Sequence, residues 1–436
     1  MPDRASALDE THDPARRSWV GSANRPDTDF PIQNLPFGVF APSGGRPRGG
    51  IAIGDTILDI SAAQAAGLFE GEAAQAAEAA SGPALNPLLA LGPDAARALR
   101  RQAGALLDAG SKPRPDLLHE AAGSALHLPV TVRNYTDFYA GIHHATAATS
   151  IMRPGTPPLP PNYKYVPIAY HGRASSVRAS GGEVRRPAGQ RAPDPTEPPT
   201  FGPSERLDLE LEMGLFVGAG NALGEPIPIA EAGRHVWGFC LLNDWSARDI
   251  QAWEMAPLGP FLGKNFSTTI SPWIVTADAL APFRVGAMTR PEGDPRPLDY
   301  LWSEDDQQSG GLDVDLAVSM RTGRMREAGE AAAVIIRSNA RHLYWTPAQM
   351  LAHHSSGGCN MLPGDVLGTG TISGPTDEQL SSLLELTFGG RKPFTLPNGE
   401  RRGFLENGDE VIFSARCRRE GFASIGFGPC SGRIVA

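Results

Sequence analysis

A run of alternating leucines and acids constrains the fold of this 436-residue chain more than any other segment. It reads Leu207, Asp208, Leu209, Glu210, Leu211 and Glu212. Because side chains alternate between the two faces of an extended strand, the leucines share one face and the carboxylates share the other. Three neighbouring carboxylates repel one another unless a positive charge lies among them. A hard cation bound through oxygen ligands would supply that charge.

The same pattern also fits a half-exposed antiparallel strand, with leucines inward and polar side chains outward. Two details favour the metal site. Every polar position of the run is acidic, with no Lys or Thr between the acids. The next apolar segment, 235–242, leads into Asn243 and Asp244, which places another carboxylate at a strand end.

Composition limits the classes of protein that the chain can belong to. Gly and Pro, at 50 and 40 residues, exceed the usual share of roughly 12%. With 41% hydrophobic residues, this excess predicts a folded protein rich in turns and short strands. The net charge of -9, without a basic patch, argues against a nucleic-acid partner. No apolar stretch approaches the ~18 residues of a membrane span, so no membrane partner is expected.

The chain divides by pattern into three parts. Residues 1–28 are polar, lack the apolar core of a signal peptide, and are predicted to form a flexible tail. Residues 29–128 predict a small β-rich domain with attached Ala-rich helices. Residues 129–436 predict a larger domain of short strands between Gly- and Pro-rich loops. The four widely spaced cysteines favour a reducing cytosol over disulfides or zinc.

Several side chains outside the acidic run are candidates for chemistry. Asp137 is a further carboxylate, and His144 is a candidate general base, although a lone histidine is often simply packed. Glu385 lies in an apolar run predicted as a strand. A buried acid without a partner is costly, so Glu385 requires one, and a histidine is suitable.

Three further polar residues follow Asp244. Arg248 and Gln251 lie three positions apart, on one face of a predicted helix. Aimed at the same place, they would bind a carboxylate or a developing oxyanion; the alternative is a solvated helix face. Lys264 follows Gly263 among apolar residues, where its charge would act strongly if the site is dry. Its surroundings lack the spacing of a phosphate-binding loop.

Taken together, several motifs in one order resemble the fumarylacetoacetate hydrolase family. The resemblance runs from about residue 29 to residue 428, nearly the whole chain. It is carried by residues 135–139, 171–177, 208–212, 243–251, 259–264 and 370–374. It implies a mainly β (α+β) fold, with a small SH3-like N-terminal domain, a large mixed β-roll C-terminal domain, and a cytoplasmic homodimer.

The resemblance also implies a metal site holding Ca²⁺ or Mg²⁺. Its residues would be Asp137, Glu210, Glu212 and Asp244, with Lys264 and Thr268 close by. This all-oxygen ligand set suits a hard cation. Asp208 is not among the implied ligands, so the acidic face is reduced from three ligands to two.

The activity implied by the resemblance is hydrolysis of a carbon–carbon bond in the diketo acid 4-fumarylacetoacetate, in tyrosine and phenylalanine breakdown. His144, oriented by Glu385, would activate water, and three residues would stabilise the alkoxide: Arg248, Gln251 and Lys264. The implied substrate contacts are Tyr139, Arg153, Gln251, Met255 and Thr371. Met255 departs from the family pattern, which has Tyr there.

Two alternatives remain open from the sequence. One is a related acylpyruvate or 2-oxo acid hydrolase, decarboxylase or lyase that shares the acidic ligands. The other is a metal-stabilised protein without catalytic activity.

Overall fold

One large mixed sheet connects the two ends of the molecule in the computed structural model, which describes residues 8–194 and 196–436. It has 13 strands, with a main path ordered β4-β3-β2-β1-β17-β14-β13-β22-β6-β7. Their bounds are β1 Phe37–Pro42, β2 Arg48–Ile53, β3 Thr56–Asp59, β4 Leu118–Glu120, β6 Tyr135–Phe138, β7 Ala169–His171, β13 Leu211–Val217, β14 Val236–Asp244, β17 Trp273–Thr276 and β22 Val366–Gly368. Three more join at the side: β5 Ser124–His127 on β1, β16 Thr268–Ile270 on β14, and β8 Val177–Ala179 on β16.

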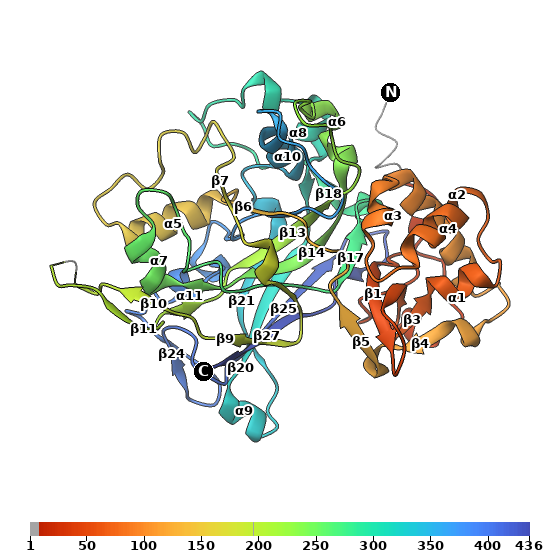
Figure 1. Cartoon of the computed structure of the whole chain (residues 1–436), viewed down its shortest axis with the longest axis horizontal. Helices are drawn as coiled ribbons and strands as arrows, with labels where there is room; N and C mark the ends of the chain where they lie inside the picture. Colours follow the sequence, from red (N-terminus) through yellow and green to blue (C-terminus); the bar gives the residue numbers. More distant parts are fainter. Residues whose placement is uncertain (1–7, 195) are drawn as a thin grey trace.

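The N-terminal strands carry four helices, which lie beside them at one end of the molecule (Figure 1). These helices are α1 Ile60–Ala65, α2 Gly71–Ala80, α3 Asn86–Ala90 and α4 Pro93–Leu107. Pro93 begins α4, a position whose backbone N–H has no partner within the helix, so the missing N–H of proline costs no hydrogen bond. Leu99, Ala103 and Leu107, four apart, face one buried side. They share a core with Trp237 and Leu242 of β14, so the N-terminal part packs directly on the large sheet.

A second sheet of six strands contacts β13 and β14 of the large sheet and is ordered β21-β20-β25-β27-β9, with β26 on β25. Its strands are β9 Gly182–Arg185, β20 Asp315–Arg321, β21 Ala333–Asn339, β25 Glu410–Cys417, β26 Ile425–Gly426 and β27 Cys430–Val435. Short two-stranded pairs are formed by β10 Ala188–Arg191 with β11 Thr200–Pro203, β12 Leu207–Asp208 with β15 Ser246–Ala247, β18 Arg284–Val285 with β19 Gly311–Leu312, and β23 Phe394–Thr395 with β24 Arg401–Arg402. The remaining helices are α5 Ile142–Met152, α6 Ile229–His235, α7 Arg248–Glu254, α8 Glu304–Ser309, α9 Gly323–Glu327, α10 Pro347–Ser355 and α11 Leu383–Leu386. These mixed sheets with helices agree with the expected α+β class.

The central strand β13 lies between two hydrophobic cores. Leu211, Met213 and Leu215 belong to the larger C-terminal core. Phe216, one position out of phase, belongs to the core shared with the N-terminal helices. Glu212 has the same parity as Phe216, so it points to the second face of the sheet. The end of that face, beyond the apolar side chains, is where the polar site forms.

The acidic run differs in one respect from a single strand. Residues Leu207–Asp208 form β12 and pair with β15, whereas β13 begins only at Leu211 and pairs with β14. Glu210 lies between them and forms an isolated bridge with Ser382. All six residues of the run are buried, so the half-exposed strand is wrong. The alternation holds locally, but the chain changes its pairing partner in the middle of the run.

The segment before residue 29 is also different from the expectation. Residues 8–28 are not a loosely attached tail, because Thr11, His12 and Ser18 are buried. The His12 ring Nε2 hydrogen-bonds the Asp278 carbonyl at 2.9 Å, and Ser18 donates to a carbonyl of α4 at 2.7 Å. Tertiary contacts of this kind are not visible in a polar composition. Residues 1–7 lie outside the described part of the chain.

The described helices include none that is long and apolar enough to cross a membrane.

Candidate active site

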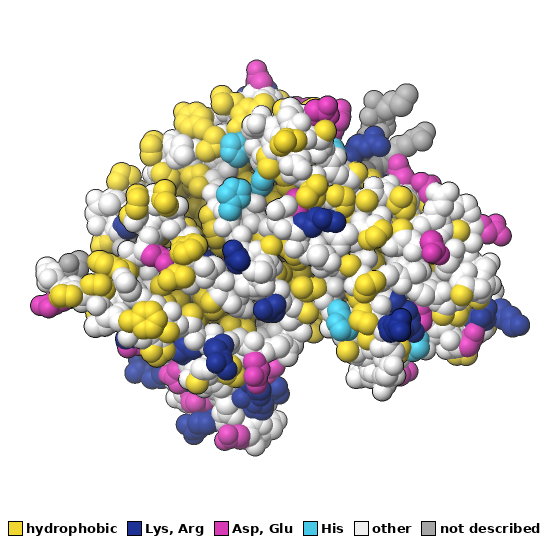
Figure 2. Space-filling view, viewed as in Figure 1, with side chains coloured by type: hydrophobic (Ala, Val, Ile, Leu, Met, Phe, Trp, Pro, Cys, Tyr) yellow, Lys and Arg dark blue, Asp and Glu magenta, His cyan; other side chains and the backbone are white. Residues whose placement is uncertain are grey.

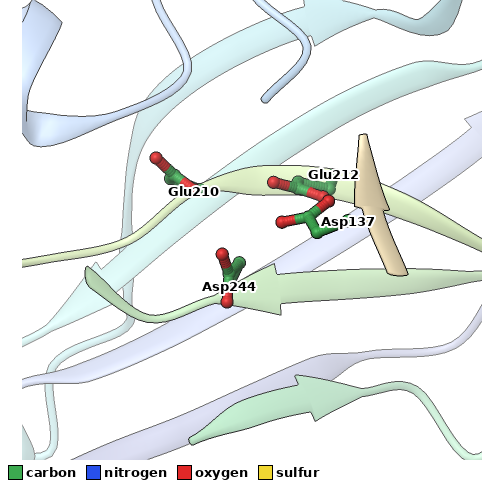
Figure 3. Close-up of side chains that lie close together, drawn as sticks. All are labelled: Asp137, Glu210, Glu212 and Asp244. Atoms are coloured by element: carbon green, nitrogen blue, oxygen red, sulfur yellow. The ribbon is translucent and has the colours of Figure 1, made fainter. Parts of the chain in front are cut away.

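Four buried carboxylates converge at one end of the large sheet (Figure 3). They are Asp137 of β6, Glu210, Glu212 of β13 and Asp244 of β14. One oxygen from each lies within 4.8 Å of the others. Segments more than a hundred residues apart in the sequence therefore build a single cluster, and all four side chains are ones that the sequence predicted as ligands.

The sheet register explains how Asp137 and Glu212 meet. β22 lies between β6 and β13, and its Gly368 is opposite both Asp137 and Gly214. A Cβ at position 368 would lie 2.3 Å from Asp137 Oδ1 and 3.0 Å from Glu212 Oε2. Position 368 must therefore be glycine, because the two carboxylates occupy the space above its backbone.

The cluster has more negative charge than its protein partners neutralise. Burial and then the neighbouring Asp244 raise the pKa of Asp137 well above its ordinary value. Burial and then Asp137 do the same to the pKa of Glu212. Asp137 Oδ1 and Glu212 Oε1 also have no hydrogen-bond partner in the described part of the chain. Unpartnered buried carboxylate oxygens are costly, and four convergent oxygens fit a hard divalent cation.

Asp244 and Glu210 are held from the other side by Lys264. The Lys264 ammonium donates to Asp244 Oδ2 at 2.7 Å and also to Glu210. Burial alone would raise the pKa of Glu210, but Lys264 and Arg248 outweigh it and keep this carboxylate ionised. Thr268 donates to Asp244 Oδ1 at 3.3 Å.

Tyr170 completes the support of Asp244 and is a residue that sequence reasoning missed. Its hydroxyl donates to Asp244 Oδ2 at 2.7 Å. Tyr170 lies on β7 directly opposite Asp137 of β6. The signal would have been the pairing of these two strands, which the sequence alone does not give.

His144 lies between the cluster and a buried acid. Its Nδ1 donates to Glu385 Oε2 at 2.8 Å, and its Nε2 lies 3.7 Å from Glu210 Oε1. Burial would raise the pKa of Glu385, but His144 and two serine hydroxyls lower it, so Glu385 is an ionised acceptor. The donor on Nδ1 leaves Nε2 as the basic nitrogen, facing the site.

Glu385 is not in a strand, as its apolar neighbours suggested, but in the short helix α11. Ser373 donates to Glu385 at 2.9 Å and Ser382 at 2.7 Å. Neither serine was singled out from the sequence. A serine before a four-residue helix is too common a pattern to indicate support for a catalytic group.

Arg248 and Gln251 share one face of α7, as expected. Arg248 Nη1 donates to Gln251 Oε1 at 3.2 Å, and both side chains are buried. Arg248 Nη2 approaches Glu210 Oε1 to 2.8 Å, close enough for an ion pair but not aligned as a hydrogen bond. Arg248 Nε donates to Asp208 Oδ2 at 2.8 Å. The solvated helix face is therefore wrong.

The predicted substrate contacts are less uniform. The Tyr139 ring packs edge-on against His144, with ring centroids 5.6 Å apart. Thr371 is buried just beyond β22. Met255 is half-buried at the end of α7, one turn after Gln251. Arg153 is exposed at the end of α5, and the described part of the chain gives its side chain no contact with the cluster.

Comparison with known proteins gives consistent family matches. Residues 33–129 match the family described as "Fumarylacetoacetase N-terminal", and residues 133–435 match "Fumarylacetoacetate (FAA) hydrolase C-terminal". The chain is 47% identical to a fumarylacetoacetase of Bos taurus and 46% identical to that of Homo sapiens. Each match covers 94% of this chain and 97% of the relative. A fumarylacetoacetase of Arabidopsis thaliana is 47% identical over 94% of this chain and 96% of its own.

Among solved structures, the fold is similar to that of a fumarylacetoacetate hydrolase from Exiguobacterium antarcticum. The TM-score is 0.50 at 15% identity, over 92% of this chain and 99% of the other.

Proposed function

This chain belongs to the fumarylacetoacetate hydrolase family, and we propose that its carboxylate cluster and His144–Glu385 pair form one site for hydrolysing a carbon–carbon bond of 4-fumarylacetoacetate. The products are fumarate and acetoacetate, and the reaction is the last step of tyrosine breakdown. The single observation that carries this function is the buried, oriented histidine beside the four carboxylates. A metal-stabilised protein without activity does not require a general base oriented in this way.

Asp137, Glu210, Glu212 and Asp244 would hold the metal. An oxygen-only set favours Ca²⁺ or Mg²⁺ over softer ions. Bound there, such an ion would act as a Lewis acid toward the diketone end of the substrate. Lys264 would hold Glu210 and Asp244 in place, and Tyr170 and Thr268 would fix the orientation of Asp244.

His144 would act as the general base. With Nδ1–H directed at Glu385, its Nε2 can take a proton from a water molecule in the site. That water attacks the ketone carbonyl carbon of the fumaryl group and forms an alkoxide. Cleavage of the adjacent carbon–carbon bond then leaves the new carboxylate on fumarate. The electron pair leaves with the acetoacetate carbon, which takes up a proton.

Arg248, Gln251 and Lys264 would stabilise the alkoxide. All three are buried, Arg248 and Lys264 beside Glu210 and Gln251 beside Arg248, where charge acts more strongly than in water. Tyr139, Met255, Thr371 and Arg153 would contact the substrate. Met255 offers no hydroxyl, so it would contribute apolar contact at its position rather than a hydrogen bond.

We also propose a homodimer, because apolar side chains are exposed around α7 and the loop that follows (Figure 2). Trp253, Leu258, Phe261 and Leu262 are exposed there, Leu258 by 96%. Exposed apolar side chains gathered in one region favour association. Light scattering would report the mass in solution.

The four free cysteines favour a reducing, cytosolic location. The N-terminal strands would form the SH3-like domain.

The test is turnover of fumarylacetoacetate followed by its absorbance, with fumarate and acetoacetate quantified as products. We expect equimolar products with Ca²⁺ or Mg²⁺ and loss of turnover with a chelator. Absence of turnover with either ion, or consumption of oxaloacetate instead, would contradict the proposal and favour a decarboxylase.

A further inference from the structure

Asp208 is a fully buried carboxylate that lies outside the four-carboxylate cluster. Its Oδ1 accepts hydrogen bonds from the backbone N–H groups of Leu383, at 2.7 Å, and Leu209, at 2.8 Å. Its Oδ2 accepts from the backbone N–H of Leu384, at 2.9 Å, and from Arg248 Nε, at 2.8 Å. Four donors therefore converge on one side chain.

Two of these donors lie directly before Glu385. Leu383 and Leu384 begin α11, a helix of only four residues that cannot satisfy its own first N–H groups. Asp208 accepts from both, and it thereby fixes the backbone that carries Glu385. Glu385 in turn fixes the His144 ring through Nδ1.

Another of the four donors, Arg248, belongs to α7. Arg248 uses Nε for Asp208, which leaves Nη1 for Gln251 and Nη2 facing Glu210. A guanidinium is planar, so fixing Nε sets the direction of the other two nitrogens. Asp208 thus determines where Arg248 presents its charge.

We propose that Asp208 is a positioning residue that sets the base-orienting Glu385 and the alkoxide-stabilising Arg248 relative to each other. This rests on the function proposed above. Asp208 is not one of the four cluster carboxylates; it acts through the two groups that it holds. Its place in the acidic run reflects this role, and not a third metal ligand.

The test is an Asp208→Asn variant, which keeps the shape but replaces one acceptor oxygen by a donor. We expect kcat to fall roughly 10- to 100-fold, while KM and cation affinity stay within about threefold. The matched control is Asp409→Asn, since Asp409 is also fully buried and accepts from an arginine Nε, at 2.9 Å, and a backbone N–H. The control should lower stability but leave kcat within about twofold.

A double-mutant cycle separates positioning from a merely structural role. In an Arg248→Gln background, Asp208→Asn should cost at least fivefold less in kcat than in the wild-type background, because one of its two targets is already gone. Equal fold-losses in both backgrounds would overturn the proposal. If Asp208→Asn does not fold, the double variant, which removes both buried charges, is compared with Arg248→Gln alone. Failure of Asp208→Asn and of the double variant to fold would also overturn the proposal.

Hydrogen exchange gives a readout that does not depend on activity. In Asp208→Asn, exchange should accelerate in residues 381–386 and stay unchanged in β14. Uniform acceleration, or none, would contradict positioning. Lack of turnover by the wild type would refute the proposed function alone, whereas an active wild type with an unaffected Asp208→Asn variant would refute the positioning role alone.

Discussion

Replacing Glu212 by Gln is expected to stabilise the metal-free protein while removing most of the stabilisation that a cation provides. Glu212 is fully buried, and its Oε2 accepts from the Gly370 N–H at 3.0 Å. A glutamine oxygen can keep this bond. The new amide N–H₂ would lie near Asp137 Oδ1, which has no partner in the described part of the chain. A repulsive contact thus becomes a donor–acceptor contact.

The size of each effect follows from the environment of Glu212. Satisfying one buried acceptor and removing one like charge contributes about 1–3 kcal/mol. Unfolding entropy is roughly 2.1 cal/mol/K per residue, or about 0.9 kcal/mol/K for 436 residues, so the melting temperature should rise by about 1–3 °C. A cation at a hundred times its Kd stabilises the wild type by about 2.7 kcal/mol. With three carboxylates instead of four, we expect the variant to gain less than about 1 kcal/mol.

Thermal unfolding measured in chelator and in excess Ca²⁺ or Mg²⁺ gives both effects, and calorimetric titration gives the affinity. Glu225→Gln is the control, because Glu225 is exposed and is not one of the four buried carboxylates. It should show the wild-type response in both conditions. A Glu212→Gln protein that is less stable without metal, or that keeps the wild-type response to the cation, would refute the assigned cluster.

Three further changes test other parts of the account. Glu385→Gln should lower kcat by roughly 10³- to 10⁴-fold without loss of cation binding, since an amide donor favours the wrong tautomer of His144; turnover near the wild-type rate would contradict this. Gly368→Ala should abolish cation binding in calorimetry, because the new Cβ would lie 2.3 Å from Asp137 Oδ1; unchanged affinity would show that the register is wrong. Burial raises the pKa of the Asp306 carboxyl to about 6 in the folded protein. Between about pH 4 and pH 6 the folded state therefore binds a proton that the unfolded state has released. The resulting stabilisation of the folded protein is complete below about pH 4 and is lost as the pH rises through 6. Asp306→Asn should therefore flatten the pH dependence of melting and gain up to about 3 kcal/mol at pH 8; a melting profile that stays parallel to the wild type would contradict the shift.

The acidic run shows how far sequence reasoning reaches. Alternation and the uniform acidity of the polar positions were enough to predict that Glu210 and Glu212 share a site with a cation. They could not reveal that β12 and β13 pair with different strands, since pairing depends on segments far away in the chain. For that reason Asp208 and Glu212, both buried in the same run, serve different neighbours.

Supporting residues were harder to find than charged ones. Tyr170, Ser373 and Ser382 have ordinary types and ordinary spacing, and they are identifiable only once β7 and α11 are placed. The prediction of a flexible N-terminal tail was wrong for residues 8–28 for a related reason. The polar composition of this segment suggested a tail, yet the buried Arg100 holds the segment by donating to the Thr11 hydroxyl. The same guanidinium nitrogen donates to the Asp278 carboxylate at 2.8 Å.

The central proposal is that the cluster binds the cation and that His144 separately activates water. Turnover and cation binding of a His144→Ala variant, measured on the same preparation, test this claim most directly. We expect fumarylacetoacetate turnover to be lost while Ca²⁺ or Mg²⁺ binds with an affinity within a few fold of the wild type. A His144→Ala protein that still releases fumarate at a substantial rate would contradict the account.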